Sequence, residues 1–272
     1  MSVAHAQFPE GVAVAAHQKS KEQFKLFVTE IWIEYSLSMW LTSPLISAKH
    51  GFSVRHGGVS RAPFDSLNFD DRQDDPALVQ QNRTLALQAL GFDPEKVARL
   101  NQIHSCEVLE AQAGIQTADA LVSCEPGLAL AIGTADCYPL LFHDPVNGVV
   151  GAAHAGWKGT VGRIGARTLE AMERLGADRQ HIQVAIGPGI SAAQYWVGPE
   201  VSKQFRDAGF PEGCFPEGQH LDLLQANRFV LLEAGLSEHQ LWTAGRCSTE
   251  TDFFSYRRDA GVTGRMWAVI GL

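Results

Sequence analysis

Apolar and polar positions divide most of the chain into short runs that predict both strands and helices. Four runs are almost continuously apolar and are bounded by glycine or polar turn residues, the pattern of strands buried on both faces. These are "GLALAIGTAD" (127–136), "GVVGAAHAG" (148–156), "IQVAIGPGI" (182–190) and "MWAVIGL" (266–272). A fifth run, "HGFSVRHGGVS" (50–60), predicts a strand that leads into a turn at Gly57–Gly58.

Other segments repeat apolar positions every three to four residues, which predicts helices. One of them opens with Asp75 as a candidate N-cap and Pro76 in the first turn, and Gly91 follows its end. Another stops at Gly176. The predicted helices cover residues 22–41, 74–92, 160–177 and 221–235.

Strands and helices are mixed along the chain without internal repeats and without strict alternation. A plain doubly wound parallel sheet is therefore not expected, and no GxGxxG or Walker-type loop joins a strand to a helix. The pattern predicts one mixed α/β domain over residues 39–272. Residues 1–38 are interpreted as an N-terminal extension that is partly disordered or helical.

Composition narrows the classes of function. The formal net charge is -8, and the only adjacent arginines are Arg257 and Arg258, so a nucleic-acid binder is not expected. Five cysteines, an odd number, favour a reduced, cytoplasmic compartment over a disulfide framework. The apolar N-terminal window is interrupted by Glu30 and Glu34, so it predicts no membrane span, and an interfacial or dimer-contact helix remains the alternative there.

Three residues at the ends of apolar runs are candidates for chemistry. His104, Cys137 and His154 each stand where a run meets a turn, and 33 and 17 residues separate them. Two imidazoles and a thiolate suit a catalytic zinc site with one open position, and they also suit copper. The spacing matches no short-range zinc motif. Cys137 and His154 as a hydrolase dyad, or all three as inert core residues, stay open at this point.

Further polar residues predict a substrate shell. Arg55 precedes the Gly57–Gly58 turn, whose backbone N–H groups can hold a phosphate. Asp136 adjoins Cys137 and can orient a ligand, and Lys158 stands in "HAGWKG" just before a helix, a place that favours anions. An ordinary turn, a capping residue and a surface lysine are the structural alternatives.

Nine segments occur in a fixed order, and together they are more specific than any one of them. They are "RHGGVSRAPFDSLNF", "NQIHS", "ADALVS", "TADCYPLLFHDP", "HAGWKGTVGRI", "AIGPGIS", "VGPEV", "FFSYRRD" and "GR". Over residues 42–272 the chain resembles the laccase-domain family, once called multicopper polyphenol oxidases and now regarded as purine nucleoside phosphorylases.

The resemblance implies an α/β sandwich with two mixed β-sheets flanked by helices. It implies that His104, Cys137 and His154 bind a metal, with zinc the usual occupant and copper the alternative, and that Arg55 lies at the phosphate end of the pocket. The implied function is a zinc-dependent purine nucleoside phosphorylase for adenosine, inosine, guanosine and methylthioadenosine, with adenosine deaminase activity. Purine nucleosides and phosphate are the expected partners.

Two rival enzymes and two departures from the family pattern stay in view. A copper-dependent polyphenol oxidase is disfavoured because a multicopper centre needs more histidines, and none of the four methionines adjoins the candidate ligands. A cysteine-type peptidoglycan-editing hydrolase would use Cys137 and His154 alone. Gly189 stands where the family commonly has cysteine, and Trp196 where it often has an acidic residue, so substrate preference can differ.

Overall fold

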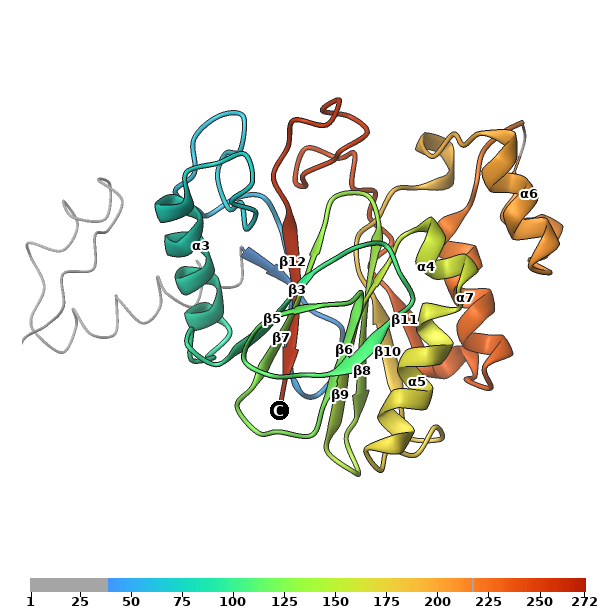
Figure 1. The fold of residues 1–272 in the computed structure, drawn as a ribbon, viewed down its shortest axis with the longest axis horizontal. Helices are drawn as coiled ribbons and strands as arrows, with labels where there is room; N and C mark the ends of the chain where they lie inside the picture. The colour runs from blue at the N-terminus through green and yellow to red at the C-terminus, as the bar shows by residue number, and fades with distance from the viewer. Residues whose placement is uncertain (1–38, 217) are drawn as a thin grey trace, which may run out of the picture.

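Two six-stranded mixed β-sheets lie face to face in the residues that the computed structural model describes, 39–216 and 218–272 (Figure 1). The first sheet has the order β1 (Trp40–Leu41), β2 (Lys49–Ser53), β12 (Met266–Gly271), β7 (Ala129–Thr134), β3 (Val97–Asn101) and β5 (Gly114–Thr117). The second has the order β11 (Leu241–Thr243), β10 (Gln183–Ile186), β8 (Tyr138–Asp144), β9 (Val149–Ala155), β6 (Ala120–Ser123) and β4 (Val108–Glu110). The sandwich of two mixed sheets is confirmed.

Helices cover the outer face of each sheet (Figure 1). Helix α3 (Pro76–Ala89) covers the first sheet, and α4 (Trp157–Val161), α5 (Ile164–Arg174), α6 (Pro199–Asp207) and α7 (Leu223–Glu233) cover the second. The described residues also hold three short 3-10 helices, η2 (Ala192–Gln194), η3 (Glu212–Cys214) and η4 (Glu238–Gln240). None of the described helices is long and apolar enough to cross a membrane.

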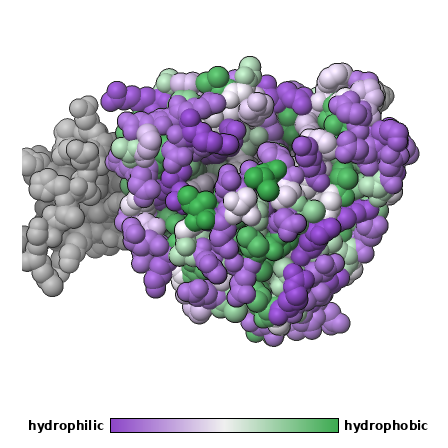
Figure 2. All heavy atoms as spheres, in the orientation of Figure 1, coloured by the Kyte–Doolittle hydropathy of each residue, from purple (hydrophilic) through white to green (hydrophobic). Residues whose placement is uncertain are grey.

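The core between the sheets is built from small and branched apolar side chains. Leu130 and Ile132 of β7 pack with Leu141 of β8 and with Val150 and Ala152 of β9, and all are buried. Because helices close the outer faces, every residue of β8 and β9 is buried as well. This confirms the prediction that the continuous apolar runs are strands covered on both sides. On the face drawn in Figure 2, hydrophobic residues appear as small groups among hydrophilic ones.

Two predicted helices differ from the structure. The segment 160–177 is not one helix, because Arg163 adopts a left-handed conformation (φ 62°) between α4 and α5. Its guanidinium lies over the ring of Phe210, 4.3 Å from the centroid, and donates to the Ala208 carbonyl, which holds the break in place. The predicted helix 22–41 lies outside the described residues except at its end, where Trp40 and Leu41 instead form β1 against β2.

Candidate metal centre and active site

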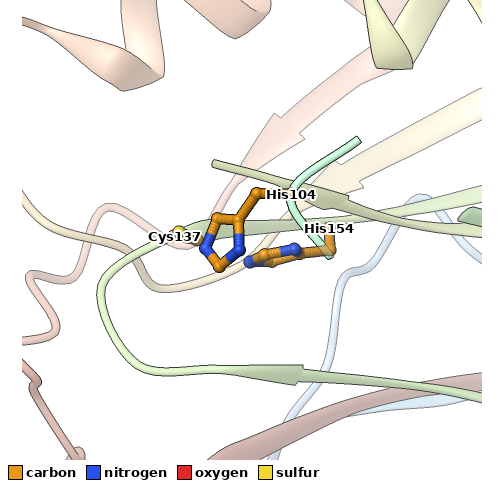
Figure 3. Close-up of side chains that lie close together, drawn as sticks. All are labelled: His104, Cys137 and His154. Carbon is orange, nitrogen blue, oxygen red and sulfur yellow. The ribbon is translucent and has the colours of Figure 1, made fainter. Parts of the chain in front are cut away.

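The structure brings His104, Cys137 and His154 together at one end of the second sheet (Figure 3). Their ligand atoms all lie within 4.8 Å of one another. The two imidazole rings meet edge to face, with centroids 4.8 Å apart and planes at 77°. No other group of three or more His, Cys, Asp or Glu ligands is gathered in this way in the described residues. Residues far apart in sequence thus form one compact donor set.

Strand pairing and a glycine explain how the three residues meet. Pro139 of β8 pairs with His154 of β9, so Cys137, just before β8, lies beside the end of β9. Gly156 follows that strand, and a Cβ atom there would lie 2.9 Å from Cys137 Sγ and 3.2 Å from His104 Cδ2. A side chain at this position would fill the space in which the ligand atoms gather. Glycine is therefore required at position 156, because Cys137 and His104 approach its backbone too closely for a side chain.

The buried carboxylate of Asp119 organises the centre. It accepts hydrogen bonds from the backbone N–H groups of Ile103, His104 and Ser105 and from the Ser105 hydroxyl, at 2.6–3.2 Å. These bonds hold His104 in a left-handed conformation (φ 58°), which is costly for a residue other than glycine. His154 Nδ1 lies 2.8 Å from Asp119 Oδ1. Because the carboxylate only accepts, Nδ1 carries the proton and Nε2 remains for a metal.

Charge and burial act together on these groups. Burial would raise the pKa of Cys137, but the adjacent His154 and His104 outweigh it and lower that pKa to about 6. Burial would lower the pKa of His154, but Cys137 and Asp119 outweigh it and raise it to about 9. Burial would raise the pKa of Asp119, and the bonds from His154 and Ser105 instead lower it to about 2. At neutral pH the sulfur is therefore a thiolate, the form that binds metals.

The donor set fits a single metal ion. A thiolate and two imidazoles are the ligands of catalytic zinc sites that keep the fourth position open, and copper accepts the same set. Asp119 supplies the outer hydrogen bond that metal-bound histidines usually make. The residues present therefore fit the metal that the sequence predicts.

A cavity of about 710 Å³ opens at this centre. His104, Cys137 and His154 line it, together with Asp136 and an aromatic set formed by Trp157, Tyr195 and Tyr256. Cavities of this size and mixed polarity are typical small-molecule sites. The candidate metal centre thus faces a space large enough for a nucleoside.

Asp136 lies at the cavity but is committed to the protein. Its carboxylate accepts from the hydroxyls of Ser248 and Ser255 and from the Arg257 backbone N–H, each at 2.7 Å. Its own backbone has a left-handed φ of 91°. Asp136 therefore ties the C-terminal loops to the segment that carries Cys137, and a role in substrate binding stays a prediction.

The Arg55 turn lies elsewhere. Arg55 pairs with Asp65 and stacks on Phe254, with its guanidinium 4.8 Å from the ring centroid. The backbone N–H of Gly58 donates to the Ser66 hydroxyl. Neither Arg55, Gly57 nor Gly58 lines the cavity described above. These contacts favour a structural turn, and the phosphate role of the three residues stays a prediction.

The structure also shows where Lys158 lies, and where the two positions lie at which the sequence departs from the family pattern, Gly189 and Trp196. Lys158 is exposed and lies over the Trp157 ring, outside the cavity lining. At Gly189 a Cβ atom would come within 2.5 Å of the Tyr138 ring, so a cysteine there would require that ring to move. Trp196 is 57% exposed and follows Tyr195 at the cavity, although it does not line the cavity itself.

The comparisons with known proteins agree with this architecture. The family model described as "Multi-copper polyphenol oxidoreductase laccase" matches residues 49–272. The chain belongs to this laccase-domain family, and it is an enzyme of the kind found there.

Three relatives illustrate the family. A "Purine nucleoside phosphorylase" of Deinococcus radiodurans is 58% identical over 235 residues, which cover 85% of this chain and 92% of that protein. "Adenosine deaminase RL5" from an unknown prokaryotic organism is 35% identical over 83% of this chain and 94% of its own length. The crystal structure of YlmD from Geobacillus stearothermophilus superposes with a TM-score of 0.79 at 34% identity, and covers 86% of this chain and 98% of that one.

Proposed function

We propose that this chain is a zinc-dependent purine nucleoside phosphorylase that also deaminates adenosine, acting in the cytoplasm on adenosine, inosine, guanosine and methylthioadenosine. The observation that carries the proposal is the three-ligand centre of His104, Cys137 and His154 at the end of a nucleoside-sized cavity. The names of the relatives support the two activities. All five cysteines are free, as a reducing compartment would leave them.

The side chains of the site have distinct tasks in this proposal. Bound zinc would supply Lewis acidity at the open end of the donor set. Asp119 keeps the proton on His154 Nδ1, so that Nε2 would be available to hold the ion. Trp157, Tyr195 and Tyr256 offer ring faces on which a purine base can stack. The ligands bind and orient, and the aromatic walls exclude water from the base.

A cysteine hydrolase is the second candidate, and one observation favours it. The lowered pKa of Cys137 beside His154 is also the condition of a nucleophilic thiolate–imidazole pair. Substitution of His104 separates the two: His104→Ala removes a metal ligand and abolishes a zinc reaction, whereas a dyad of Cys137 and His154 keeps turnover. A copper oxidase has less support, because the described residues hold one three-ligand group.

Release of free base from adenosine and inosine by the zinc-loaded protein, with and without phosphate, tests the proposal. We expect phosphate-dependent release, together with phosphate-independent formation of inosine from adenosine. Cys137→Ala should lower the bound zinc from about one per chain to near zero and abolish both reactions. Cys124→Ala, which changes an exposed cysteine, is the matched control. Full zinc content in Cys137→Ala, or no release by the native protein, would contradict the proposal.

A further inference from the structure

The cavity carries an excess of positive charge in a negatively charged protein. Five arginines line it, against three carboxylates, while the whole chain has a formal net charge of -8. The arginines are Arg72, Arg83, Arg99, Arg257 and Arg265, and the carboxylates are Asp70, Asp71 and Asp136. Such a local excess, in a concave site, attracts an anionic ligand.

Most of these charges are already paired within the protein. Arg72 makes a bidentate pair with Asp70, and Arg83 pairs with Asp71 at 3.1 Å. The third carboxylate, Asp136, is saturated by the two serines and the backbone described above.

Three arginines therefore lack a carboxylate partner at ion-pair distance among the described residues. Arg257 uses both terminal nitrogens on the carbonyls of Gln194 and Trp196. Arg99 makes no side-chain hydrogen bond there, and β3 pairs it with Ala131 of β7, six residues before Cys137. Arg265 remains as the candidate near the centre.

Arg265 is held so that one edge of its guanidinium stays available. Its Nη1 donates to the carbonyls of Thr263 (3.2 Å) and Gly264 (2.9 Å). Its backbone N–H donates to Asn68 Oδ1 at 2.9 Å, and the guanidinium lies 5.8 Å from the ring centroid of Tyr256. In the described part of the chain, Nε and Nη2 donate to no acceptor. These two atoms form the edge with which arginine binds an oxyanion through two parallel hydrogen bonds.

Strand pairing places Arg265 near the metal ligands, because Met266, the next residue, pairs with Thr134 of β7, three residues before Cys137, and Arg265 lines the same cavity as the three ligands. Burial lowers the pKa of Arg265, Asp70 opposes that shift and Arg72 adds to it, and the charges of Cys137 and Asp136 also act on the group. Asp70 is the strongest opposite charge, but Arg72 donates hydrogen bonds to both of its oxygens. A partly desolvated arginine beside another arginine gains most when an anion binds.

We propose that Arg265 holds inorganic phosphate, the second substrate, against the nucleoside at the metal centre, in the role that the sequence predicts for Arg55. The proposal rests on the phosphorylase function above. In the step that it serves, a phosphate oxygen forms a bond to C1′ of the ribose and the bond from C1′ to the purine nitrogen breaks. The electron pair stays on the purine, which takes up a proton from dihydrogen phosphate or water. The products are ribose 1-phosphate and free base.

Steady-state kinetics of the zinc-loaded full chain test this assignment. Loss of a bidentate, charge-assisted pair costs about 1.5–3 kcal/mol, so Arg265→Gln should raise KM for phosphate about 10- to 100-fold. KM for inosine should change less than about twofold, because Arg265 is assigned to the phosphate and not to the nucleoside, and the deamination of adenosine should change as little, because no phosphate takes part in it. Arg265→Lys keeps the charge without the two-donor edge and should recover part of the loss. Arg61→Gln, at an exposed arginine, is the control for lost charge.

Two further variants decide between the arginines. A rise in KM for phosphate in Arg55→Gln or Arg99→Gln, with none in Arg265→Gln, would overturn the proposal. So would an equal loss of deamination and phosphorolysis in Arg265→Gln and Arg265→Lys, since that would show a general structural role.

A binding measurement separates this inference from the proposed function. Inorganic phosphate should raise the Tm of the native holoprotein, and Arg265→Gln should abolish that rise. If the native protein showed no phosphorolysis but kept this phosphate-dependent rise, the proposed function would fail and the anion site would stand. If AMP raised the Tm through Arg265 and inorganic phosphate did not, the site would belong to a phosphate ester, and the assignment to the second substrate would be wrong.

Discussion

The two ends of the β8–β9 pair hold the same chemical groups in opposite arrangements. At the end that carries the metal centre, the ring of His154 is hydrogen-bonded to the buried carboxylate of Asp119. At the far end, His143 adjoins the equally buried Asp144, but His143 Nδ1 has no hydrogen-bond partner in the described structure. The pKa of His154 is raised to about 9, whereas burial lowers that of His143.

The direction of each carboxylate explains the difference. Asp119 shares its oxygens between a loop and an imidazole, so it both shapes the backbone and stabilises positive charge on the ring. Asp144 accepts hydrogen bonds from the N–H groups of Val146 and Asn147, in the turn that follows β8, and of Asp178, which follows α5. The effect of burial on the pKa of the histidine is thus outweighed only at the end that carries the metal centre. The far end uses the same residue types to close a turn.

Replacing either carboxylate, Asp119 or Asp144, with alanine should give the largest effect, a loss of stability. Asp119→Ala leaves several buried donors without an acceptor, so we expect a loss of about 3 kcal/mol or more in the free energy of unfolding. Asp144→Ala should cost a similar amount, because that carboxylate accepts four hydrogen bonds against five at Asp119. Urea unfolding of the two metal-free variants measures this.

Zinc affinity should separate the same two variants. Asp119→Asn keeps the size and part of the hydrogen bonding but loses the charge that orients His154, and it should weaken zinc binding about 10- to 100-fold. Asp144→Asn should leave zinc binding within about twofold. Competition with a chromogenic chelator gives both values. Equal zinc affinities would show that Asp119, like Asp144, only supports a loop.

Gly156→Ala tests how closely the metal end is packed. The new methyl group would lie 2.9 Å from Cys137 Sγ, so the thiolate or the backbone must shift. Overpacking of this kind costs about 1–3 kcal/mol, and we expect at least about a tenfold loss of zinc affinity with it. At Gly213 an added Cβ meets nothing within 4 Å, and Gly213→Ala is the matched control. Native zinc affinity in Gly156→Ala would mean that the centre is plastic rather than closely packed.

The sequence predicts the central strands and the well-capped helices. The apolar runs become β7, β9, β10 and β12, and helices α3 and α7 are confirmed, the former capped as predicted by Asp75. The apolar pattern does not predict the short strands β3, β4 and β5: β4 and β5 lie at sheet edges, and in all three strands partly exposed side chains weaken the pattern. The break at Arg163 depends on Phe210, a contact that local periodicity does not encode.

The sequence indicates the metal ligands but not the groups that support them. Asp119 lies in the segment "ADALVS", and an acidic residue directly before a buried strand was the available signal. Its importance appears only when the loop 103–105 and His154 are folded onto it. In the sequence Arg55 is the more conspicuous arginine, because it stands just before Gly57–Gly58. Arg265 lies in the short segment "GR", which by itself predicts no function. Which arginine faces the cavity is a property of tertiary structure.

The far end offers the smallest predicted effect, a change in pH dependence. The folded-state pKa of His143 lies below that of an unfolded histidine, first through burial and further through His50, while Asp144 opposes the shift. Below about pH 6.5 the unfolded chain therefore binds a proton that the folded chain does not. The free energy of unfolding then decreases by up to about 1.4 kcal/mol for each unit by which the pH is lowered. Above that pH the contribution vanishes.

His143→Leu should remove this acid-dependent loss, whereas His181→Leu, at an exposed histidine, should keep it. Urea unfolding of the metal-free proteins at pH 7.5, 6.5 and 5.5 measures the difference, and the titrations of Cys137 and His154 cancel because all the proteins share them. His154 has the opposite sign: a raised folded-state pKa gives stability at low pH that is lost as pH rises. Parallel pH curves for His143→Leu and the native chain would mean that His143 takes up a proton in the folded state, and the contrast between the two ends would disappear.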